Sequence, residues 1–102
     1  MEQTVSEPTD EVARAIALLE SQHEFPGAFE FRVVIRPAHR SSAVAALLAA
    51  AGGSDTLLEV SERSSSHGNY LALRVRVQVD AAERVLQVYE VMREVEGVLT
   101  IM

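Results

Sequence analysis

Four arginines lie at alternating positions of two segments that have the pattern of β-strands. They are Arg32 and Arg36 in the first segment and Arg74 and Arg76 in the second. Guanidinium groups bind carboxylate or phosphate oxygens through paired N–H donors, and they repel one another where no acid pairs with them. The spacing therefore predicts either an anion-binding face or a lattice of ion pairs with Glu30 and Glu59, which could equally be a dimer surface.

A serine-rich segment just before the second of these strands is another candidate binding site. Its residues are Ser65, Ser66, His67, Gly68 and Tyr70. Serine hydroxyls and backbone amides in such a loop can hold an anion or a carboxylate. The simpler interpretation is a hairpin turn, in which the serines satisfy local backbone groups and Gly68 supplies a positive φ. A Ser–His nucleophile would also need an orienting carboxylate and an oxyanion hole, and the sequence signals neither.

The remaining residues that could support catalysis or metal binding form no recognisable motif. The chain has no cysteine, which excludes thiolate metal sites and cysteine nucleophiles. The three histidines, His23, His39 and His67, are too far apart for a local metal motif. Residues 36–40 contain no glycine, whereas acylphosphatases carry a glycine-rich phosphate loop after their first strand. We therefore expect no enzyme activity, no metal and no cofactor.

The charge of the chain is concentrated near its N-terminus. The net charge is −6, and residues 1–24 carry −5 of it, so the rest of the chain is nearly neutral. Nucleic-acid-binding domains normally have a basic excess and stacking aromatics, and only Tyr70 is available on the open face, so no nucleic-acid partner is expected. The chain shows neither a membrane-spanning run nor a signal-peptide pattern, which favours a cytoplasmic protein with no membrane partner.

The sequence divides into three parts. Residues 1–8 are polar and predict a disordered leader. Residues 9–22 have the spacing of an amphipathic helix, which packs either on its own domain or on a partner. Its apolar stripe consists of Val12, Ala15, Ile16 and Leu19. Residues 23–102 form one domain, entered through a turn at Pro26–Gly27, in which proline presets φ and glycine permits a positive φ.

Within this domain, strands and helices follow one another in the order β-α-β-β-α-β. The strands are expected at 29–36, 56–63, 69–79 and 98–102, with helices at 40–51 and from Asp80 onward. Asp80 and Glu83 suggest a capping box. Leu58 and Val60 are the expected core residues of the second strand. The order predicts an α+β, ferredoxin-like sandwich, in which both helices cover one face of a four-stranded antiparallel sheet.

Two segments of the sequence resemble signatures of the YbeD-like proteins. They are the first-strand segment from His23 to Val33 and the hairpin from Ser65 to Tyr70, and the resemblance covers roughly residues 23–102. It implies a small bacterial cytosolic protein with a fold similar to ACT regulatory domains. It implies no established activity, although a link to lipoate metabolism has been proposed for that family.

The resemblance favours a non-catalytic regulatory or binding module. Its ligand would be a small carboxylate or a partner protein, bound at the serine hairpin, at the arginine face or at a homodimer seam. The alternative is a protein–protein adaptor or a homodimeric structural module without a small-molecule ligand.

Overall fold

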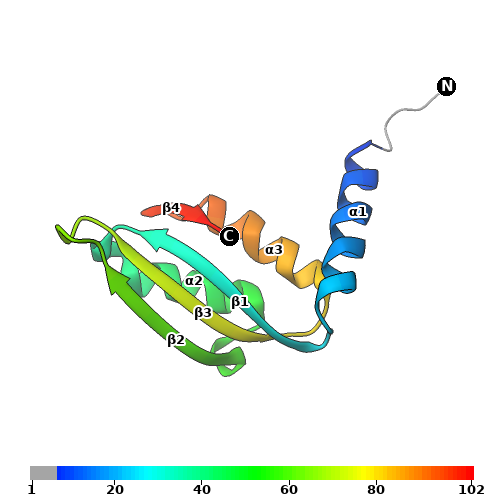
Figure 1. Cartoon of the computed structure of the whole chain (residues 1–102), viewed down its shortest axis with the longest axis horizontal. Helices are drawn as coiled ribbons and strands as arrows, with labels where there is room; N and C mark the ends of the chain where they lie inside the picture. The colour runs from blue at the N-terminus through cyan, green and yellow to red at the C-terminus, as the bar shows by residue number, and fades with distance from the viewer. Residues whose placement is uncertain (1–6) are drawn as a thin grey trace.

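The computed structural model describes the backbone of residues 7–102 and the side chains of residues 10–102. It contains three α-helices and a four-stranded sheet, which confirms the predicted α+β class (Figure 1). The leader predicted at 1–8 falls mostly outside the described residues. Helix α1 (Glu7–Gln22) begins slightly earlier than the predicted residue 9.

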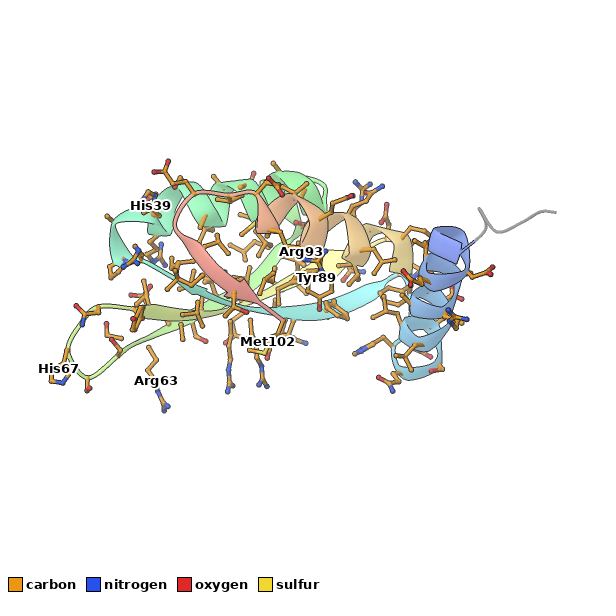
Figure 2. The ribbon with its side chains drawn as sticks, turned by 90° about the horizontal axis from the view of Figure 1, so that it is seen from above. His39, Arg63, His67, Tyr89, Arg93 and Met102 are labelled. Carbon is orange, nitrogen blue, oxygen red and sulfur yellow. The ribbon has the colours of Figure 1, made fainter. Side chains whose placement is uncertain are left out.

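The four strands are antiparallel to their neighbours and lie in the order β2-β3-β1-β4. They are β1 (Gly27–Ile35), β2 (Leu57–Ser64), β3 (Leu71–Val79) and β4 (Val98–Ile101). Helices α2 (Arg40–Ala51) and α3 (Ala82–Arg93) both cover the same face of the sheet, and the other face is open (Figure 2). This arrangement is compatible with a ferredoxin-like fold.

Strands β1 and β3 form the centre of the sheet because every second side chain of each is apolar and buried. The predicted inward residues are confirmed: they are Phe29, Phe31, Val33 and Ile35 in β1, and Leu71, Leu73, Val75, Val77 and Val79 in β3. Helix α2 adds Leu47 and Leu48, and α3 adds Val85, Val88 and Met92. The intervening polar side chains of β1 and β3 all point to the open face, where the candidate site must lie.

The prediction that Leu58 belongs to the core is wrong. Its side chain is 49% exposed. The register of β2 against β3 shifts between Leu57 and Glu59, so Leu58 is the extra residue of a bulge. Val60 packs against the core as predicted, and Leu57 does so in place of Leu58.

Two predictions at turns and caps are also wrong. Asp80 does not cap α3, because Ala81 is the N-cap and no side chain makes a capping hydrogen bond. The Asp80 carboxylate instead accepts hydrogen bonds from the Arg84 guanidinium at 3.3 and 3.1 Å, and these bonds hold the pKa of Asp80 below its usual value. Gly27 does not have a positive φ. A Cβ at this position would lie 2.5 Å from the carbonyl oxygen of Glu24, so close packing rather than φ favours glycine.

Helix α1 stands at one end of the sheet and points away from it (Figure 1). It packs on its own domain through Leu19, which contacts the core, but Val12 of the same predicted stripe remains 49% exposed. The apolar stripe is therefore only partly covered within the chain.

Candidate functional site

The open face of the sheet places side chains from three neighbouring strands in rows. In one row, Arg32 lies opposite Arg74, which in turn lies opposite Ser61. In the next row towards the serine hairpin, Ala72 separates Val34 from Arg63. The pleat therefore brings three arginines from β1, β2 and β3 close together on one face.

Two acidic residues pair with arginines of this face, as predicted. The Arg32 Nε donates to Glu30 Oε2 at 3.2 Å, and the Arg76 Nη1 lies 3.9 Å from Glu59 Oε1. These four side chains are substantially solvent-exposed, so the two pairs contribute little to stability. Part of the predicted ion-pair lattice is thus present.

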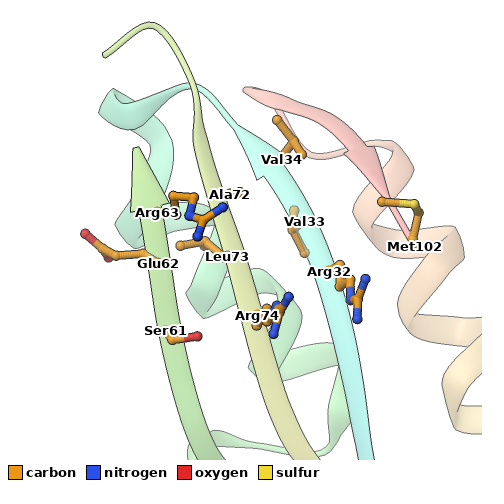
Figure 3. A pocket seen from close by; sticks show the side chains of 10 residues that line it. All are labelled: Arg32, Val33, Val34, Ser61, Glu62, Arg63, Ala72, Leu73, Arg74 and Met102. Carbon is orange, nitrogen blue, oxygen red and sulfur yellow. The ribbon is translucent and has the colours of Figure 1, made fainter. Parts of the chain in front are cut away.

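The lattice does not extend to all the arginines. Within residues 10–102, neither Arg63 nor Arg74 has a carboxylate within salt-bridge distance. Glu62 does not serve Arg63, because it points to the outer edge of β2 and pairs with Arg40 of α2 (Figure 3). The guanidinium groups of Arg63 and Arg74 are therefore available to a ligand.

These arginines surround a shallow hollow of about 390 Å³ in the open face (Figure 3). We call it the arginine hollow; it is lined principally by Arg32, Val34, Ser61, Arg63, Ala72 and Arg74. The short side chains of Ala72 and Val34 form its floor between the longer arginines. Arg63 was missed in the sequence because 56–63 lacks a clear alternation. Counting back along β2 from the serine hairpin would have placed Arg63 and Ser61 on the open face.

Two of the predicted arginines lie outside the hollow. Arg76 is one row away and is paired with Glu59. Arg36 follows the end of β1 and precedes a short 3-10 helix (Pro37–His39), and its backbone N–H donates to the Gly97 carbonyl at 2.9 Å. The structure therefore brings together only Arg32 and Arg74 of the four predicted arginines.

The serine hairpin protrudes at the end of the sheet far from α1, with His67 at its tip (Figure 2). The Tyr70 N–H donates to the Ser65 hydroxyl at 3.0 Å, and the Ser65 N–H donates to the Tyr70 carbonyl at 2.9 Å. Gly68 has φ 73°, as predicted for the turn. Ser65 thus closes the hairpin, while Ser66, His67 and Tyr70 are exposed and do not line the arginine hollow.

A protein-family model matches residues 20–102, and its description is a protein of unknown function (DUF493). The chain belongs to this family. The match begins within α1, so most of that helix lies outside the family region. No curated protein matches the chain.

The histidines of this DUF493 member lie in separate surroundings. The His23 ring packs on Phe29 at 4.8 Å between centroids, and His39 packs beside Gly97. Within residues 10–102, no three His, Asp or Glu side chains come together in a way that could hold a metal ion. No helix in the described part of the chain is both long and apolar enough to cross a bilayer.

Proposed function

We propose that this DUF493 chain is a non-catalytic, YbeD-like and ACT-like binding module that holds an anionic ligand or partner in the arginine hollow. The observation that carries the proposal is the pair of arginines beside Arg32, Arg63 and Arg74, for which residues 10–102 supply no acidic partner. Arginines on adjacent strands repel one another unless an anion lies between them. A bound anion would supply the negative charge that offsets this repulsion.

A binding role rather than catalysis agrees with the side chains that line the hollow. The only hydroxyl among them is Ser61, and no histidine lies beside it to act as a base. The carboxylates nearest the hollow, Glu30 and Glu62, are already paired with arginines. Such a set can bind and orient an anion but offers no activated nucleophile.

Native mass spectrometry of the protein purified gently from its own cells tests this function. We expect the wild-type spectrum to contain a species that is heavier than the bare chain by the mass of a bound molecule, the companion. Arg74→Gln should lose this species. Arg93→Gln removes an arginine from α3, on the helical side of the sheet, and should keep the companion (Figure 2). A companion that survives Arg74→Gln, or a wild type that carries none, contradicts the proposal. A second copy or another protein as the companion would favour the adaptor alternative over a small ligand.

A further inference from the structure

The charge around the arginine hollow is the first indication of its ligand. Three guanidinium groups border it, and among residues 10–102 an acidic partner on the same face is found for Arg32 alone, namely Glu30. Glu59 pairs with Arg76 in the neighbouring row, and Glu62 pairs with Arg40 of α2. Three guanidinium groups outnumber the carboxylates of Glu30 and of Glu62, and Arg40 already pairs with Glu62, so the hollow keeps a positive excess. A dianion would neutralise more of this excess than a single carboxylate would.

The arrangement of the donors is the second indication. Arg32 and Arg74 lie directly opposite each other, and Arg63 approaches from the next strand, one row along. Neighbouring strands are about 4.8 Å apart, which lies within the reach of an arginine side chain. A carboxylate has two coplanar oxygens that one or two arginines saturate. A phosphoryl group has three terminal oxygens arranged tetrahedrally and can accept from donors on three sides.

The floor of the hollow is the third indication. Ala72 and Val34 lie in the same row as Arg63, beside the row of Arg32 and Arg74, and their short side chains do not fill the space above the sheet. The volume of about 390 Å³ falls within the range of small-molecule sites. The hollow is open to solvent, so the rest of a ligand can extend outward.

We propose that the arginine hollow binds the dianionic phosphoryl group of a small soluble phosphate monoester. This inference rests on the proposed function and specifies its ligand class. Arg32, Arg63 and Arg74 each donate to the phosphoryl oxygens, and the Ser61 hydroxyl lies at the rim as a further donor. No bond is made or broken, and the ester portion faces solvent.

Amide shifts in ¹⁵N-labelled full-length protein provide the test, with inorganic phosphate and glycerol 3-phosphate as probes at pH 7.5. We expect shifts at residues 32, 61–63 and 72–74, and binding at least about tenfold tighter than that of acetate or succinate. A charge-assisted hydrogen bond contributes roughly 1.5–3 kcal/mol, so Arg63→Gln or Arg74→Gln should each weaken binding by about tenfold or more. Arg93→Gln should bind like the wild type.

The pH dependence distinguishes a dianion from any other anion. Phosphate monoesters lose their second charge near pH 6, whereas sulfate stays dianionic, so lowering the pH to 5 should weaken phosphate binding but not sulfate binding. Glu62 of β2, which pairs with Arg40, borders the hollow, while Glu30 of β1 and Glu59 of β2 lie one row away, on either side of Arg76. Protonation of these carboxylates would strengthen the binding of phosphate and of sulfate equally, so the sulfate measurement corrects for this effect.

The outcomes separate this inference from the function on which it rests. Succinate or acetate binding as tightly as phosphate at the same amides overturns the phosphate assignment and keeps the anion site. If no anion shifts these amides, or if the shifts persist in Arg74→Gln, both the phosphate assignment and the proposed function are overturned. Binding to vesicles containing phosphatidate but not to glycerol 3-phosphate would replace the soluble ligand with a lipid headgroup and overturn the proposal as stated.

Discussion

Tyr89 joins the core of the domain to its surface. Its ring meets the buried Phe31 edge-on, with 5.5 Å between centroids, and the residue is only partly buried. Burial raises the pKa of the Tyr89 hydroxyl above its usual value of 10.0, and the nearby positive charge of Arg93 opposes part of that rise. The folded protein therefore favours the neutral hydroxyl.

Replacing Tyr89 with phenylalanine should reduce the loss of stability at high pH. The pKa of Tyr89 is higher in the folded than in the unfolded chain. The stabilisation that comes from its neutral hydroxyl is therefore complete below about pH 10 and is lost as the pH rises through the folded pKa. Urea unfolding at pH 9 to 11 should therefore give a shallower fall for Tyr89→Phe than for the wild type. Tyr70→Phe, which removes a hydroxyl from the exposed hairpin, is the matched control. Parallel curves for wild type and Tyr89→Phe would show that burial does not favour the neutral form.

Single residues show where sequence analysis of this site succeeds and where it stops. Arg32 and Arg74 could be placed on one face because strict alternation surrounds both. Arg63 was not placed by alternation, because four consecutive polar residues end its strand, and counting back from the serine hairpin was the signal that would have placed it. Ion pairing also depends on the distance between side chains in the folded chain, which the sequence pattern does not give. The partner of Glu62 is Arg40, and only the position of α2 in the structure shows this.

At the level of elements, alternation predicted β1 and β3 well and β2 poorly. An inserted residue reverses the faces of everything on one side of it, and nothing in the sequence of β2 marks the insertion. Helix α2 was predicted with its observed limits, 40–51, because Gly52 and Gly53 follow it in the sequence. In the structure Gly52 ends the helix with φ 127°. The position of the α3 N-cap was missed because Asp80 pairs with Arg84 instead of capping.

The bulge in β2 predicts effects of different size for two adjacent leucines. Leu57→Ala should lower the free energy of unfolding by about 1–2 kcal/mol, because Leu57 packs against the core. Leu58→Ala should change it by less than about 0.5 kcal/mol, because its half-exposed side chain lies in the bulge. Chemical denaturation of the two variants measures both values. Equal costs, or a larger cost at Leu58, would mean that β2 keeps regular alternation in solution.

The whole molecule is elongated rather than round. Its extents are 53 × 27 × 21 Å and its radius of gyration is 15.1 Å, whereas a compact chain of this length is expected near 13 Å. Much of the length comes from the protruding serine hairpin at one end and α1 at the other (Figure 1). The family match covers the sheet and its two helices but leaves out most of α1. The sequence predicted both projecting elements, but not their position at opposite ends, which depends on long-range packing.

Because α1 depends on few core contacts, its backbone should open far more readily than the sheet. An isolated helix of 16 residues is only marginally stable in water, and within residues 10–22 it is Leu19 that packs against the core. Hydrogen exchange followed by mass spectrometry should show α1 amides exchanging at least about a hundredfold faster than those of β3. Leu19→Ala should accelerate exchange throughout α1 and leave β3 unchanged. Equal protection of α1 and β3 in the wild type would require α1 to be covered by a contact beyond its own domain, and the exposed Val12 and Leu18 would be the first residues to examine for it.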